Sequence, residues 1–303
     1  MTDISKEILE KYQIRKSKKQ KTEFMEFMRA HFPELNVEEG GFAKNRNIVI
    51  GNVSTAKAVF GAHYDTCAAM PVPNFIMPKN MFVSFLYGVL IAVPILAVSI
   101  LASGIVRSLT DNIVLFELTY FGFMFGMLYL MMAGPANKHT VNDNTSGIIT
   151  LIELMSTMSP EERAQYAFVF FDNEELGLLG SSFFAKKHKE EMKDKLLINF
   201  DCVSDGDDIL FIIDKKFYDE YAESLKSAFE QVDDKRISVE SNRGVFYPSD
   251  QKNFKKNIGV AAFKKSRFGL YLGRIHTKRD TVMDERNIEV IIDGTLKFVE
   301  NIG

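Results

Sequence analysis

Five short polar segments carry histidines and carboxylates that could bind metal ions. They are HYD (63–65), DNTSG (143–147), DNEELG (172–177), NFD (199–201) and GRIHTKRDT (273–281). Carboxylates and imidazoles that converge without a cation would repel one another or lack partners, and this set of donors suits zinc. The five segments therefore predict a metal centre with enough ligands for two zinc ions, an arrangement that serves hydrolysis.

Taken singly, these residues have simpler interpretations. A lone His63 is more often a hydrogen-bonded core histidine, and neighbouring glutamates such as Glu174 and Glu175 are usually solvated. However, Glu174 and Glu175 follow the apolar run AFVFF, and Asp201 follows LLINF. Strands of this kind deliver the residues that follow them to one edge of a sheet, where open α/β sheets place their sites.

Alternating apolar strands and amphipathic helices indicate an α/β fold with a mixed, mainly parallel sheet covered by helices on both faces. The predicted strands cover residues 47–52, 56–66, 165–171, 195–201, 207–213 and 259–265. The predicted helices cover residues 4–31, 145–158, 176–192, 215–232 and 287–302.

Two long apolar segments interrupt this pattern. Residues 82–105 contain no charged side chain, and residues 113–133 contain only Glu117. The first would form a helix of about 36 Å, enough to cross a hydrocarbon core of roughly 30 Å. A pair of buried core helices is the alternative. We expect a transmembrane hairpin over 81–134, inserted into a single α/β domain made of 1–80 and 135–303.

The charges beside the hairpin indicate its orientation. Lys79 and Lys138 flank the two spans, whereas the turn between them carries one arginine and one aspartate. The positive-inside rule then places the hydrophilic domain in the cytoplasm. Glu117, near the start of the second span, is expected to snorkel toward the interface rather than to carry protons.

The basic run RKSKKQK (15–21) lies within a helical N-terminal segment, 1–31. It is interpreted either as a solvated helix face or as a patch that contacts anionic lipid headgroups. The net charge of −3 gives no reason to expect nucleic acid as a partner. The two cysteines, Cys67 and Cys202, are too few for a disulfide-built secreted domain and are expected to be buried free thiols.

The ordered series HxD, DxxSG, EE, NFD and HTxxDT resembles the two-zinc aminopeptidase family, whose members include bacterial leucyl aminopeptidase and glutamate carboxypeptidase. The resemblance extends from about residue 45 to the C-terminus, apart from the hairpin. It implies the three-layer zinc-exopeptidase fold, two Zn²⁺ ions per chain and peptide substrates.

Residue by residue, the resemblance implies a role for each motif. Asp143 would bridge the two metals, His63 and Asp201 would complete one site, Glu175 and His276 would complete the other, and Glu174 would be the general base. Asp65 would hold the imidazole of His63 in its ligating tautomer, and Asp280 would support the His276 loop.

One segment departs from the family pattern. YPSDQKNF (247–254) resembles a substrate loop in which histidine is common where this chain has Gln251, so no role is assigned to that position. Tyr247 is either a donor to the developing oxyanion or an aromatic residue packed on the core.

The expected function is that of a membrane-anchored zinc-dependent exopeptidase, with an aminopeptidase favoured over a carboxypeptidase. Two alternatives stay open: a non-catalytic scaffold on the same fold, and a glutaminyl-cyclase-like acyltransferase, which in this family uses one zinc. Because the hairpin lies between two of the metal motifs, we expect hydrophobic or membrane-associated peptide substrates. A simple anchor and an oligomerisation surface are the other roles considered for the hairpin.

Overall fold

A nine-stranded mixed sheet forms the centre of the molecule in the computed structural model, which describes residues 1–230 and 232–301. The strands are β1 (Asn36–Gly40), β2 (Asn45–Ile50), β3 (Ala58–His63), β4 (Tyr166–Phe171), β5 (Leu196–Phe200), β6 (Asp208–Ile213), β7 (Arg236–Ser241), β8 (Lys256–Ser266) and β9 (Gly269–Tyr271). Their order is β1-β2-β4-β3-β5-β8-β6-β7, with β9 paired to β8. The central strands β4, β3, β5 and β8 run parallel, which confirms the predicted sheet.

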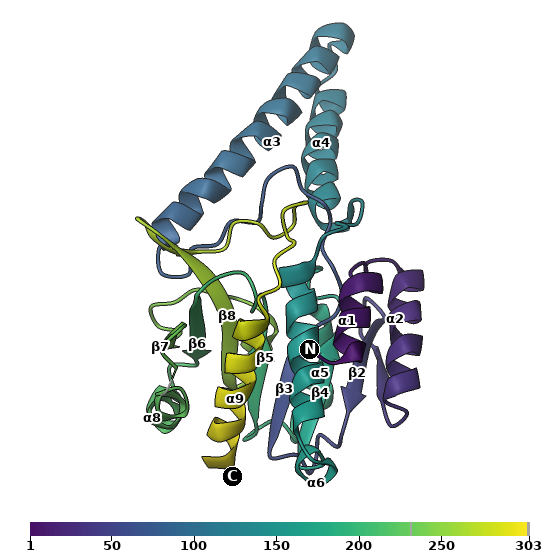
Figure 1. Cartoon of the computed structure of the whole chain (residues 1–303). Coiled ribbons are helices and arrows are strands. Elements are labelled where there is room, and N and C mark those ends of the chain that lie inside the picture. Colours follow the sequence, from purple (N-terminus) through teal and green to yellow (C-terminus); the bar gives the residue numbers. More distant parts are fainter. Residues whose placement is uncertain (231, 302–303) are drawn as a thin grey trace.

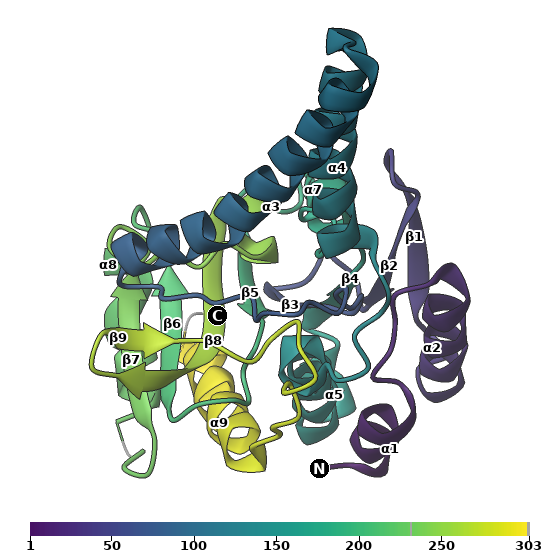
Figure 2. The same ribbon diagram turned by 90° about the horizontal axis from the view of Figure 1, so that it is seen from above.

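Helices cover both faces of this sheet (Figures 1 and 2). They are α1 (Asp3–Lys11), α2 (Lys18–His31), α5 (Ser146–Thr157), α6 (Pro160–Arg163), α7 (Leu179–Lys187), α8 (Tyr218–Ala228) and α9 (Glu285–Asn301). Side chains alternate along each strand, so Phe60 packs in the cluster with α5 and α9, whereas its neighbour Val59 packs with Phe184 of α7. The result is the expected three-layer α/β architecture.

Several element boundaries differ from the prediction. The N-terminal helical segment is two helices with a break at residues 12–17, and β1, β7 and β9 were not predicted. These three strands are short or only partly buried, so their sequences lack a strong apolar pattern. Two predicted helices, 215–232 and 287–302, include Gln231 and Ile302, which lie outside the described residues.

The two apolar segments form a helical hairpin that projects from one end of the domain (Figure 1). Its helices are α3 (Met81–Thr110) and α4 (Ile113–Ala133), both long and apolar enough to cross a membrane by length and composition. Only Ser99 and Ser103 of α3 are buried, and no residue of α4 is. The pair is therefore not part of the core of this chain, which was the alternative interpretation.

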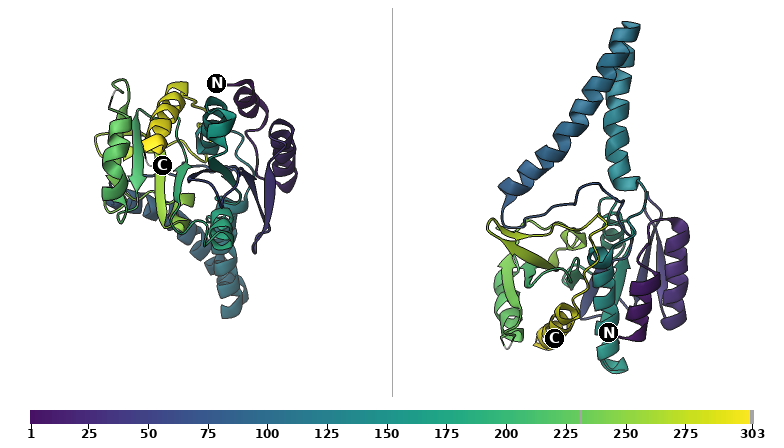
Figure 3. Two further views of the ribbon diagram at one scale, coloured as in Figure 1. Left: turned by 90° about the horizontal axis from the view of Figure 1, so that it is seen from below. Right: turned by 45° about the horizontal axis from the view of Figure 1, so that its top comes forward.

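The hairpin emerges at the edge of the sheet where β3, β4 and β5 end. The two helices diverge toward the domain, and the loops leading to and from them run across that edge (Figure 3). An isolated bridge between Ala68 and Ala136 joins these two loops, and a bridge between Ile76 and Leu272 ties the first loop to β9. The start of α3 (Met81) and the end of α4 (Ala133) together form what we call the foot of the hairpin. The bridges fix this foot to the end of the domain that carries the polar motifs.

Candidate metal centre

Parallel strands bring three of the polar motifs to one place. His63 is the last residue of β3, Asp201 directly follows β5, and Glu174 and Glu175 follow β4. Because β3 lies between β4 and β5, their carboxyl ends are adjacent. The fold therefore places these side chains together, as the sequence predicted.

Asp143 lies between the two histidines. One carboxylate oxygen, Oδ1, is 3.4 Å from Nε2 of His63, and the other, Oδ2, is 3.2 Å from Nε2 of His276. On the outer sides, Nε2 of His63 is 3.7 Å from Asp201 and Nε2 of His276 is 3.4 Å from Glu175. All five residues predicted as ligands are thus within reach of one another, in two pairs that share one carboxylate.

The donor atoms form two groups, each compact enough to surround one cation. His63, Asp143 and Asp201 form one, and Asp143, Glu175 and His276 form the other together with Cys67; within each group the donor atoms lie within 4.8 Å of one another. Oε1 of Glu175 is buried and has no hydrogen-bond partner among the residues that the structure describes. Unpaired buried carboxylate oxygens facing imidazoles are what a divalent cation would satisfy, so this donor set fits zinc.

Protonation of this cluster follows from its burial and crowding. Burial raises the pKa of Glu175 to about 8 and that of Glu174 well above its usual value. Burial disfavours the charged form of His276, but Glu175 and Asp143 outweigh it and raise its pKa to about 9. Burial also opposes ionisation of Asp143, yet hydrogen bonds with the two histidines hold its pKa below its usual value. The cluster needs protons or cations to offset its negative charge.

The carboxylate of Asp65 binds a different partner from the one predicted. Its two oxygens accept hydrogen bonds from the backbone amides of Glu174 (2.9 Å) and Glu175 (3.3 Å). Nδ1 of His63 is 3.1 Å from the backbone carbonyl of Asp65 and 3.6 Å from its carboxylate. The carbonyl therefore fixes the tautomer of His63, and the Asp65 side chain positions the two glutamates.

Asp280 also acts elsewhere than predicted. Its carboxylate accepts hydrogen bonds from the backbone amides of Asn142 (2.8 Å) and Asp143 (3.0 Å), so it holds the Asp143 loop rather than the His276 loop. Burial raises the pKa of Asp280 to about 7. The expectation that Asp280 supports the His276 loop is therefore wrong, although Asp280 does lie near candidate metal ligands.

The Asp143 loop is held close to β5. The side chain of Asn144 donates to the carbonyl of Phe200 (3.0 Å) and accepts from the amides of Gly147 (3.0 Å) and Cys202 (3.2 Å). A Cβ atom on Gly147 would lie 2.4 Å from the carbonyl oxygen of Phe200, so this position accepts only glycine. The Asp143–Asn144 peptide bond is cis.

Arg15 is buried next to the candidate metal centre. Neither interpretation of the basic run predicted this position. Its side chain is fully buried and donates to the carbonyls of Tyr12 and Tyr64 and to Oγ1 of Thr145. Burial lowers its pKa to about 9, while Asp65 and Asp143 oppose that shift. Arg15 therefore joins the loops that carry His63 and Asp143 to the N-terminal helices.

Lys21, from the same basic run, is also buried. Its ammonium lies 2.5 Å from the carboxylate of Asp172 and 2.7 Å from the side-chain oxygen of Asn173, at the start of the Glu174 loop. The solvated-face and lipid-patch interpretations are thus wrong for Arg15 and Lys21. Inside the protein, Arg15 donates to oxygen atoms of Tyr64 and Thr145. Lys21 donates to oxygen atoms of Asp172 and Asn173.

We expect Lys21→Met to destabilise the protein strongly, because it leaves the buried Asp172 carboxylate without its cationic partner. The backbone amides of Arg46 and Asn173 would be its remaining donors. Breaking such a pair costs about 3–5 kcal/mol. Lys19→Met on the same helix removes only an exposed pair with Glu23 and should cost less than about 1 kcal/mol. Thermal unfolding of the two purified full-length variants compares them, and equal midpoints would contradict the structural role of Lys21.

The loop after β7 contributes a buried acid that sequence reasoning left without a role. Both carboxylate oxygens of Asp250 are buried without a hydrogen-bond partner in the described part of the chain, and burial raises the pKa of Asp250 to about 7. The hydroxyl of the neighbouring Tyr247 donates to the carbonyl of Asp201 (3.2 Å), and its ring packs edge-on against Phe263. Gln251 is buried and bonds Tyr247 and Asn199, so it supports the loop.

Both cysteines are free and buried, as predicted. Cys67, however, belongs to one of the two groups of metal-binding donor atoms. Its position two residues after Asp65 was the available signal, but spacing alone fixed no distance.

A pocket of about 400 Å³ opens onto these residues. Asp143, Glu174, Glu175, Asp201 and His276 line it. Among the described residues that line this pocket there is no lysine or arginine. The arrangement provides a buried, carboxylate-rich site with a candidate base beside candidate metal ligands.

Comparisons with known proteins agree with the family and the fold. A family model described as Peptidase family M28 matches residues 129–299. Solved structures with a similar fold include the LapA aminopeptidase of Legionella pneumophila (12% identity, 99% of this chain and 68% of that chain, TM-score 0.57) and a glutaminyl cyclase of Porphyromonas gingivalis (13% identity, 99% and 97%, TM-score 0.60). LapB of Legionella pneumophila is also similar (14% identity, 99% and 70%, TM-score 0.57). A search of curated protein sequences gives no significant match.

Proposed function

The chain belongs to peptidase family M28, and from this premise we propose that it is a membrane-anchored aminopeptidase with two zinc ions per chain. The matched region contains Asp143, Glu174, Glu175, Asp201 and His276. His63 and Asp65 lie before that region and reach the site through β3. The observation that carries the proposal is that the two oxygens of Asp143 face two different imidazoles, each with a second carboxylate on its far side.

In the proposed site, Asp143 would contribute to both ions, His63 and Asp201 would hold one, and Glu175 and His276 would hold the other. When bound, zinc would supply Lewis-acid activation of water and of the substrate carbonyl. The resident side chains fix the positions of these donors, because Asp65 holds the Glu174–Glu175 backbone and Asp280 holds the Asp143 backbone.

Glu174 is the proposed general base. Its carboxylate takes a proton from the oxygen of the attacking water and passes it to the nitrogen of the leaving amine. Burial raises its pKa well above the usual value for glutamate, which makes the carboxylate a stronger base. Its place in the pocket, two residues after Asp172, is fixed by Asp65 and by the buried Lys21–Asp172 pair.

The charge of the pocket favours an aminopeptidase over a carboxypeptidase. A carboxypeptidase must bind the terminal carboxylate of its substrate, and arginine is the usual partner for that group. The pocket is instead lined by carboxylates and has no lysine or arginine among its described residues. Such a site attracts the ammonium group of a peptide N-terminus.

The two alternatives are less well supported. A non-catalytic scaffold would not need a complete set of ligands together with a buried glutamate beside them. A glutaminyl-cyclase-like reaction, which the family resemblance associates with one zinc, would leave the His63–Asp201 pair without a purpose. Metal analysis distinguishes them, because two zinc ions per chain support the peptidase.

We propose that the hairpin, residues 81–134, anchors the zinc peptidase domain, residues 1–80 and 135–303, in the membrane. Lys79 and Lys138 beside the hairpin favour a cytoplasmic location for the domain. Met132 of α4 lines the metal-site pocket together with Asn74 and Ile76 from the loop before α3. A pocket at the foot of a membrane hairpin favours hydrophobic or membrane-associated peptides as substrates.

Hydrolysis of peptides by the zinc-loaded protein in detergent tests this proposal. We expect release of the first residue from peptides with a free N-terminus and none from the same peptides after N-acetylation, because the acidic pocket recognises the ammonium group. Release from the C-terminus would indicate a carboxypeptidase, and loss of ammonia from N-terminal glutamine would indicate a cyclase. No turnover of any peptide would favour the scaffold.

Replacing residues 80–136 with a short linker tests the role of the hairpin. We expect the shortened protein to leave the membrane fraction and to lose turnover of membrane-associated peptides while keeping that of short soluble ones. Undiminished turnover of both would leave the hairpin as an anchor or an oligomerisation surface.

A further inference from the structure

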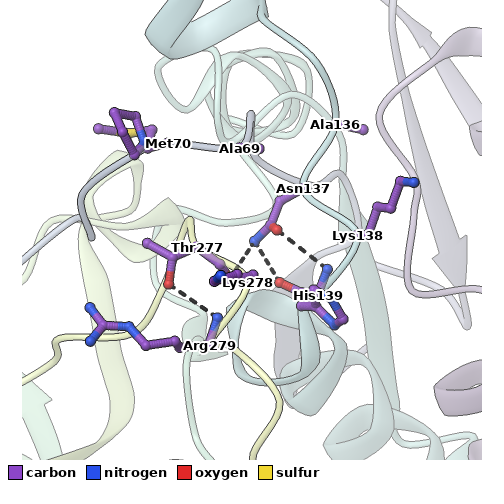
Figure 4. A pocket seen from close by; sticks show the side chains of 10 residues that line it. Ala69, Met70, Ala136, Asn137, Lys138, His139, Thr277, Lys278 and Arg279 are labelled. Carbon is purple, nitrogen blue, oxygen red and sulfur yellow. Dashed lines mark hydrogen bonds between the residues drawn. The ribbon is translucent and has the colours of Figure 1, made fainter.

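A second pocket, separate from the metal-site pocket, lies beside the foot of the hairpin. Its volume is about 640 Å³, and three loop segments form it: 69–71 before the hairpin, 136–139 after it, and 277–279 behind His276 (Figure 4). These segments lie far apart in the sequence and meet only in the folded protein. The pocket is large enough for a small polar group such as a lipid headgroup.

The pocket is cationic. Lys138, Lys278 and Arg279 line it, together with the exposed His139, and no carboxylate residue is among its described lining residues. Lys138, Lys278 and Arg279 are exposed and form no ion pair with any carboxylate in the described part of the chain. Three unpaired cations around one cavity favour an anionic ligand.

Hydrogen bonds fix the loops that carry these cations. Asn137, at the centre of Figure 4, donates to the carbonyls of His139 (2.5 Å) and Thr277 (3.1 Å), which joins the segment after the hairpin to the His276 loop. The backbone amide of Asn137 also donates to the carbonyl of Cys67 (3.1 Å). The cations therefore stand on a preformed backbone, which lowers the entropy that a ligand must overcome.

The pocket lies next to the proposed membrane surface. Ala136 follows the last residue of α4, Ala133, by a short stretch that reaches at most about 10 Å. The ammonium of Lys16 donates to the carbonyl of Met132 in the last turn of α4 (2.8 Å), which adds another cation at this level. If α3 and α4 cross a bilayer, the pocket is at the depth of the headgroups of the cytoplasmic leaflet, which is rich in anionic lipid.

We propose that this pocket binds the phosphate-bearing headgroup of an anionic membrane phospholipid. The proposal rests on the proposed membrane anchoring and identifies the lipid that the anchored domain contacts. This pocket differs from the lipid patch considered for residues 15–21, because Arg15 and Lys21 are buried and the cations that line the pocket come from two other loops. Since Met70 donates through its backbone amide to the carbonyl of His276 (2.8 Å), a bound headgroup would also hold one wall of the metal site.

Lipid titration of the full-length protein in detergent, followed by native mass spectrometry, tests this proposal. The ligands are short-chain phosphatidylglycerol, phosphatidylcholine of the same chain length, and inorganic phosphate. We expect phosphatidylglycerol to bind at least ten times more tightly than phosphatidylcholine. The variant Lys138→Gln/Lys278→Gln/Arg279→Gln should bind phosphatidylglycerol about 100 times more weakly, since each cation near a lipid surface contributes roughly five-fold.

The matched control is Lys193→Gln/Lys215→Gln/Lys216→Gln, which removes the same charge from exposed positions. These lysines precede β5 or follow β6, at the edge of the sheet opposite the hairpin. The control should bind phosphatidylglycerol as the wild-type protein does. Thermal midpoints of both variants should equal that of the wild type, because only exposed side chains change.

Three results would overturn the proposal. They are equal binding of the two lipids, unchanged binding by the pocket variant, and inorganic phosphate binding as tightly as phosphatidylglycerol, which would assign the pocket to a soluble anion. Carbonate extraction of membranes and hydrolysis of a soluble peptide, measured on the same preparations, separate these outcomes from a failure of the proposed function. A protein that is extracted by carbonate has no membrane anchor, whereas one that is retained and active but shows no lipid preference lacks only the headgroup site.

Discussion

Replacing Glu174 by glutamine should lower peptide turnover by roughly 100- to 10,000-fold, the usual contribution of a general base, while zinc stays bound. Glutamine has nearly the shape of glutamate but cannot take a proton from the attacking water. Glu174 belongs to neither group of metal-binding donor atoms, so its replacement removes no proposed ligand. Steady-state kinetics on a free peptide, with metal analysis of the same sample, measures both effects.

The neighbouring glutamate provides the sharpest comparison. Glu175→Gln removes a proposed ligand, so this variant should lose metal along with activity. Glu190→Gln changes a glutamate outside both donor groups and should alter neither quantity. Full activity of the Glu174 variant would overturn its role as the base, and loss of metal from that variant would place Glu174 among the ligands instead.

Replacing Asp143 by alanine should remove both metal ions. Each oxygen of this carboxylate faces a different imidazole, so both proposed sites lose a charged donor at once. We expect metal affinity to fall by more than about 100-fold at each site, beyond the effect of losing an outer hydrogen-bond partner. Activity should be lost with the metals, and the metal content after dialysis measures the effect.

Variants of the two histidines test whether Asp143 is shared. His63→Ala and His276→Ala should each retain one ion, because each removes a donor from only one group. Asp293→Asn, at an exposed position of α9, should retain both. Retention of two ions by the Asp143 variant, or loss of both in either histidine variant, would contradict a shared carboxylate between two sites.

Much of the fold follows from local patterns. The runs that become β3, β4 and β5 are short, apolar and followed by polar residues, a pattern typical of central parallel strands. The hairpin follows from length and lack of charge alone. Strand ends then imply that His63, Glu174, Glu175 and Asp201 lie together, because adjacent parallel strands end at the same edge of a sheet.

The partners of individual side chains were harder to predict. Asp65 and Asp280 lie near the candidate metal ligands, as expected, but their carboxylates bond the Glu174–Glu175 and Asp143 backbones instead of the histidine loops. Which amide a carboxylate meets depends on how two loops pack, to within an ångström or so. Motif order carries no information at that scale.

The sequence by itself identified the donor residues that the fold brings together and the two long apolar helices, because residue type and periodicity are local properties. Only the tertiary structure decided what the charged residues between the motifs do. Arg15 and Lys21 look solvated in sequence, yet both are buried, since carbonyl and carboxylate oxygens from distant segments compensate their charge. Lys138, Lys278 and Arg279 look unrelated in sequence, yet they surround one pocket, since the loops before and after the hairpin fold back on the His276 loop. Contacts between segments so far apart exist only after folding, and no local pattern encodes them.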